Sequence, residues 1–422
     1  MHIVIITYDW PPRNSISVHR PYSWAKYWAE QGIKVTVLTA AKQPFDEPLD
    51  LSLPQLPISI IETSNKKKGA NFLSKIFKIP WVRSISKSLI SLLTKKLNII
   101  IDPRASWCLA TKPYAIKLSK NADYVISTFG PASAHLIAMD MKKINPKIKW
   151  IADYRDLWSN NYMLKISEKL RKSIVSEEMS SVGEYADKIT TVSEDMVNKL
   201  SYLLKKPVYK VPNGFDADEK KIKKISSKIN IKIKKPLRII YTGMIYRVFR
   251  DPKPLLDAIS HLIETNQINF GDITVDFYGD RIEVAKEYAQ QSKFKPFVRI
   301  MGHVKREIAL DAQKNAGILL LLESSHPDAR GTLTGKLFEY MVAGRPILCV
   351  GSCPEYEIGQ VLSQTGTGIV VGPNEIKNLP EILLELIKKP TNVSWYKPNI
   401  DEILKYSRRK LALEMLSEIK KM

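Results

Sequence analysis

Short apolar segments alternate with helical patterns along most of this chain, in two series that a lysine-rich stretch separates. The first series of predicted strands covers residues 3–7, 34–38, 59–62, 124–127, 150–152, 188–192 and 208–211. The second series covers residues 237–241, 273–278, 298–301, 318–322, 347–349 and 368–370. Predicted helices cover residues 17–31, 72–97, 106–120, 131–144, 166–186, 194–204, 254–265, 281–291, 305–315, 336–342 and 355–363. Because strands that alternate with helices favour doubly wound parallel sheets, the sequence predicts an α/β protein.

The length of the chain predicts more than one domain. A chain of 422 residues is too long for a single hydrophobic core. Residues 216–235 carry many lysines and few apolar side chains, which is typical of a linker. We therefore expect an N-terminal domain over residues 1–215, a C-terminal domain over residues 236–398 and a terminal helix within residues 399–422.

Composition argues against several classes of protein. No apolar run is long enough to span a bilayer, and the first residues have the pattern of a core strand rather than of a signal peptide. The three cysteines, Cys108, Cys349 and Cys353, are too few for a disulfide framework, and the last two lack further zinc ligands. These features indicate a cytoplasmic, reduced protein.

The formal net charge of +22 is not spread evenly. No acidic residue occurs from Thr63 to Ile101, and residues 65–98 combine lysines with apolar side chains at three- and four-residue spacing. Such a helix suits the surface of an anionic membrane, but a solvated lysine face over a packed helix has the same pattern, and both interpretations stay open. Nucleic acid is not an expected partner, because the segment lacks aromatic-rich strands and a recognisable reading motif.

A loop and a helix start follow the buried segment at residues 317–322. Thr334 can cap the helix, Gly335 lets the backbone approach a ligand, and Lys336 adds positive charge where free N–H groups favour an anion. Glu339 lies about one turn further along the same helix. A ligand with a diphosphate at one end and a diol nearby, such as a nucleotide sugar, fits this pattern.

This pattern resembles the retaining glycosyltransferases of family 4. The resemblance covers nearly the whole chain and implies the GT-B fold, with two Rossmann-like domains that face a cleft and a terminal helix that crosses back to the first domain. That family has two glutamates seven residues apart, and Glu339 matches the second, which holds the ribose. The first falls on Gly331, so the sequence departs from the family there, and Glu323 and Asp328 are candidates to replace it without matching its spacing.

Further donor residues follow from the same resemblance. Gly243 gives close backbone approach after the first strand of the second domain. Where the family clamps the diphosphate with an arginine and a lysine, this chain has Met244 and Arg250, and Arg247 between them can supply the missing charge. The loop that receives the nucleotide base in the family corresponds here to His303 and Val304.

The first domain carries a second cluster, in which Asp153 takes the place of a family histidine that contacts the transferred sugar. Arg155 and Asp156 are expected to orient it, so these three residues are the predicted catalytic group. An Arg155–Asp156 ion pair that only fixes the loop is the alternative. Residues 102–107 and 127–135 have the form found in bacterial relatives from polysaccharide synthesis.

The loop after the first strand supplies the predicted acceptor side, namely Arg13, His19 and Arg20. The family has a glycine pair here, whereas this chain has Asn14 and Ser15.

These features together predict a metal-independent, hexosyltransferase-like retaining glycosyltransferase. We expect it to use a nucleotide diphosphate sugar, most simply a UDP-sugar, to need no cofactor, and to transfer the sugar to a glycan or lipid-linked acceptor in cell-surface polysaccharide synthesis. The expected location is the cytoplasm, with the inner face of the cytoplasmic membrane as a second possibility. A GT-B nucleotide-sugar epimerase and a catalytically silent binding subunit stay open as alternatives.

Overall fold

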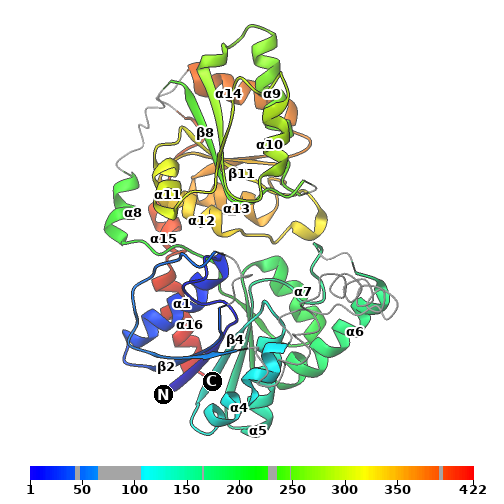
Figure 1. Ribbon diagram of the computed structural model, residues 1–422, viewed down its shortest axis with the longest axis vertical. Coiled ribbons are helices and arrows are strands. Elements are labelled where there is room, and N and C mark those ends of the chain that lie inside the picture. The colour runs from blue at the N-terminus through cyan, green and yellow to red at the C-terminus, as the bar shows by residue number, and fades with distance from the viewer. Residues whose placement is uncertain (43–47, 65–105, 164–165, 227–234, 248, 389–392) are drawn as a thin grey trace, which may run out of the picture. The chain divides into compact units, whose positions relative to one another are not determined.

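The computed structural model describes residues 1–42, 48–64, 106–163, 166–226, 235–247, 249–388 and 393–422. The chain forms two compact units (Figure 1). Unit 1 comprises Met1–Pro212 and Leu411–Met422, and unit 2 comprises Asn213–Lys410. The basic segment at 65–98, with its expected helix and membrane surface, lies outside the described residues.

Unit 1 is built on a seven-stranded sheet in which all neighbouring strands are parallel. Its strands are β1 (His2–Ile6), β2 (Lys34–Ala40), β3 (Ser59–Thr63), β4 (Tyr124–Thr128), β5 (Lys149–Tyr154), β6 (Lys188–Thr191) and β7 (Val208–Lys210). The strand order is β3-β2-β1-β4-β5-β6-β7. The sheet therefore grows in opposite directions from β1 and β4, and this change of direction is its topological switch point.

Helices cover both faces of this sheet. They are α1 (Ile16–Ala29), α4 (Ser106–Ser119), α5 (Ser133–Ile144), α6 (Glu168–Glu178), α7 (Glu194–Leu204) and α16 (Arg408–Lys420). Because side chains alternate along a strand, Val4 and Ile6 pack in one core while Ile3 and Ile5 pack in the other.

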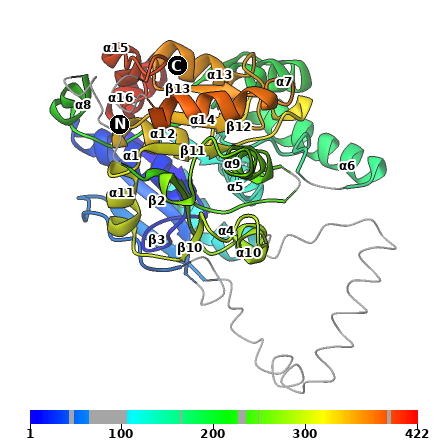
Figure 2. The same cartoon turned by 90° about the horizontal axis from the view of Figure 1, so that it is seen from above.

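The last helix returns to unit 1. Helix α16 lies beside α1 in both views (Figures 1 and 2), and Trp28 Nε1 donates a hydrogen bond to the carbonyl oxygen of Ala412 at 2.7 Å. Met415, Leu416 and Ile419 complete the core that α1 covers. The helix expected near residues 401–420 is two helices, because α15 (Ile400–Leu404) precedes α16 and packs in unit 2.

Unit 2 contains a six-stranded parallel sheet with the order β10-β9-β8-β11-β12-β13. Its strands are β8 (Leu237–Thr242), β9 (Ile273–Tyr278), β10 (Val298–Gly302), β11 (Ile318–Leu322), β12 (Ile347–Val350) and β13 (Gly368–Val371). Its helices, besides α15, are α8 (Glu219–Ser226), α9 (Lys253–Glu264), α10 (Glu283–Gln290), α11 (Arg306–Lys314), α12 (Gly335–Ala343), α13 (Glu357–Thr365) and α14 (Leu379–Lys388). The switch point of this sheet lies between β8 and β11. Helix α8 occupies part of the stretch at 216–235 that we expected to be a linker, and its Ile222 is buried in the unit 2 core.

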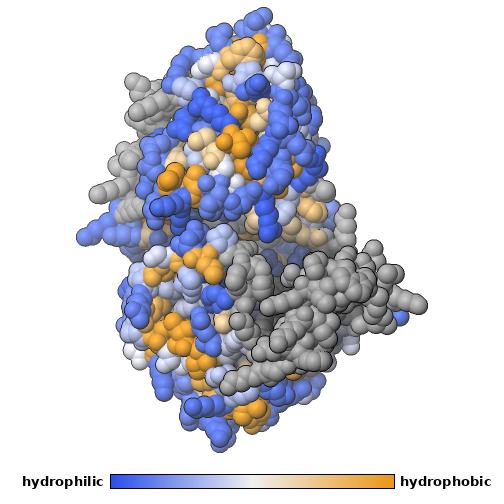
Figure 3. All heavy atoms as spheres, viewed as in Figure 1, coloured by the Kyte–Doolittle hydropathy of each residue, from blue (hydrophilic) through white to orange (hydrophobic). Residues whose placement is uncertain are grey.

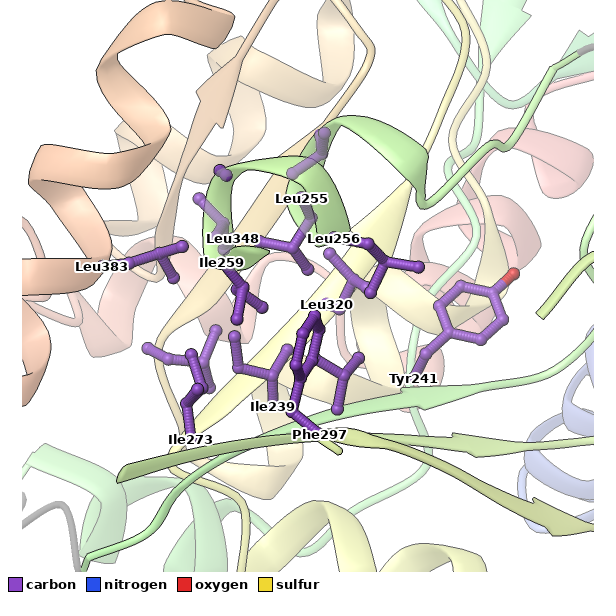
Figure 4. Close-up of a cluster of buried hydrophobic side chains, with 14 of the residues drawn as sticks. Ile239, Tyr241, Leu255, Leu256, Ile259, Ile273, Phe297, Leu320, Leu348 and Leu383 are labelled. Atoms are coloured by element: carbon purple, nitrogen blue, oxygen red, sulfur yellow. The ribbon is translucent and has the colours of Figure 1, made fainter. Parts of the chain in front are cut away.

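The core of unit 2 fixes the strands that lead to the candidate site. Figure 4 shows Ile239 of β8 and Leu320 of β11 packed against Ile259 of α9. Each such side chain contributes about 1.5–3 kcal/mol through its burial. Tyr241 lies at the edge of this cluster, with its hydroxyl group pointing away from the aliphatic side chains (Figure 4).

The two doubly wound parallel sheets confirm the predicted α/β fold class. Hydrophilic side chains cover most of the face drawn in Figure 3, with smaller hydrophobic patches among them. Within the described part of the chain, no helix is both long enough and apolar enough to cross a membrane.

Candidate functional site

A glycine marks the end of β8. Gly243 has a φ of +117°, and its N–H group donates to the carbonyl oxygen of Tyr278 at 2.7 Å. A side chain at this position would collide with Cε of Lys336 and would lie 3.0 Å from its Nζ. Gly279 stands directly behind, because a Cβ there would collide with the carbonyl oxygen of Gly243. Both glycines therefore make room for the backbone and for the Lys336 side chain.

Lys336, the second residue of α12, lies over this glycine. Its Nζ donates to Oη of Tyr241 at 3.0 Å and lies 4.8 Å from the centre of the Tyr241 ring. The Tyr241 hydroxyl in turn donates to the carbonyl oxygen of Met244 at 2.5 Å. The amine of Lys336 is thus held over the loop that begins at Gly243.

The surroundings of Lys336 weaken its hold on a proton. Burial of the amine, together with the charge of Arg250, lowers the pKa of Lys336 to about 7 against the opposing effects of Glu323 and Glu339. The two cations are therefore close enough to repel each other. A bound anion would relieve both the desolvation and the repulsion.

Arg250 and Glu323 form an ion pair at the end of β11. Arg250 Nη2 and Nε lie 3.2 Å and 3.3 Å from Oε2 of Glu323. The side chains are 16% and 5% exposed. The other oxygen of Glu323, Oε1, is buried and accepts no hydrogen bond from the described residues. Oε1 is thus an acceptor that a ligand hydroxyl group could satisfy.

The start of α12 keeps its backbone donors uncapped. Thr334 occupies the N-cap position with an extended backbone, but its side chain makes no capping hydrogen bond. Its Oγ1 is buried without a partner among the described residues, so Thr334 takes the expected cap position but does not satisfy a backbone donor of the helix. Since the first N–H groups of a helix have no partner inside it, those at Gly335 and Lys336 stay available to an anion.

Glu339 is fixed by two residues of α11. Its Oε1 accepts from Gln313 Nε2 at 2.6 Å, and its Oε2 accepts from Arg306 Nη2 at 2.8 Å. Gln313 is fully buried, and its Nε2 also lies 3.1 Å from Oγ1 of Thr242. The carboxylate of Glu339 is therefore anchored to β8 and α11 and keeps partial exposure.

Our reading of the sequence missed Arg306, Gln313 and Tyr241. The signal for the first two was their seven-residue separation, which places them on one face of a helix.

The structure brings five of the predicted residues together. Gly243 contacts Lys336, Arg250 pairs with Glu323, and the charges of Arg250, Glu323 and Glu339 all act on Lys336.

Two other predicted donor residues have partners of their own. Arg247 pairs with Glu287 of α10, and both side chains are more than half exposed. His303 Nδ1 lies 3.1 Å from Oδ2 of Asp280. Val304 packs against the unit 2 core. Gly331 is buried in the loop between β11 and α12.

In unit 1, Asp153 is completely buried at the end of β5. Arg20 donates to it through Nη2 at 2.6 Å and Nε at 3.1 Å, and the hydroxyls of Thr128 and Thr190 donate at 3.0 Å and 2.8 Å. Arg20 Nη1 donates to the carbonyl oxygens of residues 211–212 at 2.7 Å and 2.9 Å. Since a buried carboxylate needs such partners, this arrangement favours a structural role for Asp153 and Arg20 over the predicted contacts with sugar and acceptor.

Asp9, just after β1, binds Arg13 of the predicted acceptor side and two further residues. Arg13 and Ser17 both donate to its carboxylate in short hydrogen bonds. Arg155 Nη2 lies 3.8 Å from the same group. His19 is buried on α1.

Arg155 follows β5 and makes one close hydrogen bond. Its Nε donates to the carbonyl oxygen of Phe129 at 2.7 Å. Its Nη1 lies 3.9 Å from Oδ2 of Asp156, whose side chain is 59% exposed. Among the described residues, no group of three or more His, Cys, Asp or Glu side chains is placed to hold a metal ion.

Solved structures similar to this chain include three informative examples. The N-terminal domain of trehalose-6-phosphate phosphatase from Candida albicans has a TM-score of 0.64 at 11% identity, covering 100% of this chain and 96% of that one. A structure from E. coli described as trehalose-6-phosphate bound with UDP-2-fluoro glucose gives 0.62 at 12% identity, with coverage of 100% and 99%. A protein from Listeria monocytogenes assigned as a UDP-N-acetylglucosamine 2-epimerase gives 0.52 at 13% identity, with coverage of 99% and 95%.

No known family profile and no curated protein matches the sequence. At these identities the structural similarity establishes the GT-B fold and nothing more, because one fold supports many reactions. The reaction has to be argued from the site.

Proposed function

We propose that unit 2 binds a nucleotide diphosphate sugar. The main support for this proposal is that Lys336 and Arg250 lie close together beside the uncapped start of α12, at the switch point between β8 and β11. The diphosphate lies against these two cations and the free N–H groups. Glu339 accepts hydrogen bonds from the ribose hydroxyls, and the loop with His303 and Val304 receives the base.

We further propose that the chain is a retaining glycosyltransferase that uses a UDP-sugar and requires no metal. The bond between the sugar C1 and the diphosphate oxygen breaks as a bond from an acceptor hydroxyl to C1 forms on the same face. The diphosphate carries away the electron pair, and it takes up the proton of that hydroxyl. Arg250, Lys336 and the helix start stabilise the charge that develops on the leaving group.

We propose that Glu323 replaces the first family glutamate, whose position in this chain is occupied by Gly331. Its buried Oε1 has no donor among the described residues, and its Oε2 is held by Arg250. In this assignment Oε1 accepts a hydroxyl of the transferred sugar. The acceptor is a glycan or a lipid-linked carrier of cell-surface polysaccharide synthesis, and the protein works in the cytoplasm.

Calorimetry with two ligands tests the donor assignment. UDP contains a ribose and inorganic pyrophosphate does not, so Glu339→Gln should weaken UDP binding about tenfold and leave pyrophosphate binding unchanged. Lys336→Ala should weaken both. Lys314→Ala is the matched control, because this lysine is exposed at the end of α11. Equal UDP affinity in the native protein and both site variants would remove the assignment.

A nucleotide-sugar epimerase is the second candidate, favoured by the similarity to the Listeria protein. Incubation of the protein with UDP-N-acetylglucosamine and no acceptor distinguishes the two reactions. Appearance of an epimerised sugar would select the epimerase. Transfer to an added acceptor would select the glycosyltransferase. Donor binding without either reaction would indicate a silent binding subunit.

A further inference from the structure

The switch point of the unit 1 sheet gathers charged side chains. Asp9 follows β1, Gly130 follows β4 and Arg155 follows β5, so all three lie at the carboxyl ends of neighbouring strands. In open parallel sheets this edge, at the switch point, is where ligands bind. The contacts of Arg155 show which kind of ligand this edge can hold.

The terminal nitrogens of Arg155 lack hydrogen-bond acceptors in the described structure. The Nε atom is used by Phe129, but Nη1 and Nη2 lie 3.9 Å and 3.8 Å from their nearest carboxylates, beyond hydrogen-bonding distance. The side chain is 18% exposed, so water alone reaches little of it. A mostly buried guanidinium normally satisfies these donors with oxygen atoms.

The nearby carboxylate of Asp9 is shared between Arg155 and Arg13. Asp9 already receives short hydrogen bonds from Arg13 and Ser17. Asp156 is largely exposed, and its charge is screened by solvent. Among the described residues, Arg155 therefore shares its one mostly buried carboxylate partner with Arg13, and its Nη atoms can still donate to an incoming anion.

The loop after β4 is shaped around this guanidinium. Gly130 has a φ of +102°, and a side chain there would collide with Nη2 of Arg155 and lie 3.0 Å from its Cζ. Three residues later Ser133 begins α5, and its buried Oγ has no hydrogen-bond partner among the described residues. The loop thus brings an unsatisfied hydroxyl and a helix start to the same strand end as Arg155.

We propose that Arg155, Ser133 and the start of α5 form an oxyanion site that holds an acidic group of the acceptor, a phosphate or a carboxylate. The guanidinium fork binds two oxygens of that group, and the Ser133 hydroxyl donates to an oxygen. The assignment to the acceptor rests on the proposed function, whereas the site itself is a property of unit 1. In this role Arg155 binds the substrate and takes no proton from it.

Titration calorimetry of the full chain with inorganic phosphate and with acetate tests the site. The measurement is made in a Lys336→Ala background, which should weaken anion binding at the proposed donor site of unit 2. In that background we expect saturable binding of phosphate or acetate. The anion that binds more tightly indicates whether the acidic group of the acceptor is a phosphate or a carboxylate. Arg155→Gln should weaken this binding at least tenfold. Arg155→Lys keeps the charge without the fork and should show an intermediate loss.

Lys147→Ala is the control, because it removes one positive charge at an exposed position of unit 1 outside the site and should leave anion affinity unchanged. Gly130→Ala is an independent variant, since it displaces the guanidinium without removing it. The proposal would be overturned if Arg155→Gln bound the anion within twofold of the parent protein. If that variant does not fold, the same criterion applies to Arg155→Lys. Absence of saturable anion binding to the parent protein would also overturn it. Failure of UDP to bind would instead remove the donor assignment and leave this site standing.

Discussion

Lys336 donates a hydrogen bond to Tyr241 at 3.0 Å across a glycine that leaves no room for a side chain. The tyrosine ring belongs to the hydrophobic core, while its hydroxyl group belongs to the candidate site (Figure 4). The packing of unit 2 therefore sets the position of the cation.

The binding of UDP should become weaker as the pH rises above about 7. Burial and the nearby Arg250 lower the pKa of Lys336 to about 7, so the free protein loses this charge with rising pH, whereas a bound diphosphate stabilises the ammonium and raises its pKa. Affinity should fall up to tenfold for each pH unit between 7.5 and 9, where phosphate groups are already ionised. Calorimetry in two buffers of different ionisation enthalpy should show proton uptake. Lys336→Arg should abolish the dependence, and an unchanged slope in that variant would contradict the assignment.

Replacement of Gly243 by alanine should reduce both stability and UDP affinity. Its φ of +117° strains any other residue by about 1–3 kcal/mol, and the methyl group would displace Lys336. Gly32→Ala is the control for backbone strain alone, because Gly32 has a φ of +73° with no neighbouring atom within 4 Å of the added Cβ. Thermal unfolding should show a loss in both variants. A loss of UDP affinity in Gly32→Ala as large as that in Gly243→Ala would rule out the steric explanation.

Gln313→Leu should weaken UDP binding without weakening pyrophosphate binding. The variant removes the 2.6 Å hydrogen bond that orients Glu339, at a cost of about 1–2 kcal/mol. Gln313 is a positioning residue, so its effect should disappear in a Glu339→Gln background, as a double-mutant cycle would show. Gln291→Leu is the exposed control. Additive losses in the double variant would mean that Gln313 acts independently of Glu339.

Asp153→Asn should destabilise unit 1 rather than change donor binding. The variant leaves the buried charge of Arg20 without its partner, which typically costs about 3–5 kcal/mol. Asp156→Asn, at an exposed position of the same loop, should change the free energy of unfolding by no more than about 0.5 kcal/mol. Chemical denaturation measures both. A fully stable Asp153→Asn variant with lost transfer activity would restore the catalytic role that the sequence predicts.

The fold was predicted from the periodicity of apolar residues, and the errors arise where tertiary contacts determine the ends of a helix. The strands of both sheets were predictable, because each is a short apolar run between helical patterns. One helix was expected near residues 401–420, but the chain forms α15 and α16. Between them the N–H group of Phe215 donates to the carbonyl oxygen of Tyr406, and the N–H group of Arg408 donates to the carbonyl oxygen of Phe215. Such a long-range pairing leaves no trace in local spacing.

The candidate site was likewise predictable only in part. Gly243, Arg250, Lys336 and Glu339 could be selected because they occupy motif positions next to strands. The partners of Glu339 could not be selected, since Arg306 and Gln313 are polar residues whose role depends on a neighbour distant in sequence. The role of Asp153 could not be decided from the sequence, because a carboxylate after a strand has the same sequence pattern whether it faces a ligand or a buried arginine.

The return of α16 to unit 1 has a consequence for how the protein is made. Residues 1–212 leave the ribosome first, yet one face of their sheet lacks Met415, Leu416 and Ile419 until residues 411–422 have been synthesised. Unit 2, being one uninterrupted stretch, can finish its core earlier. The part of the protein that is translated first is therefore the last to be complete, and it exposes the apolar side of α1 in the interval.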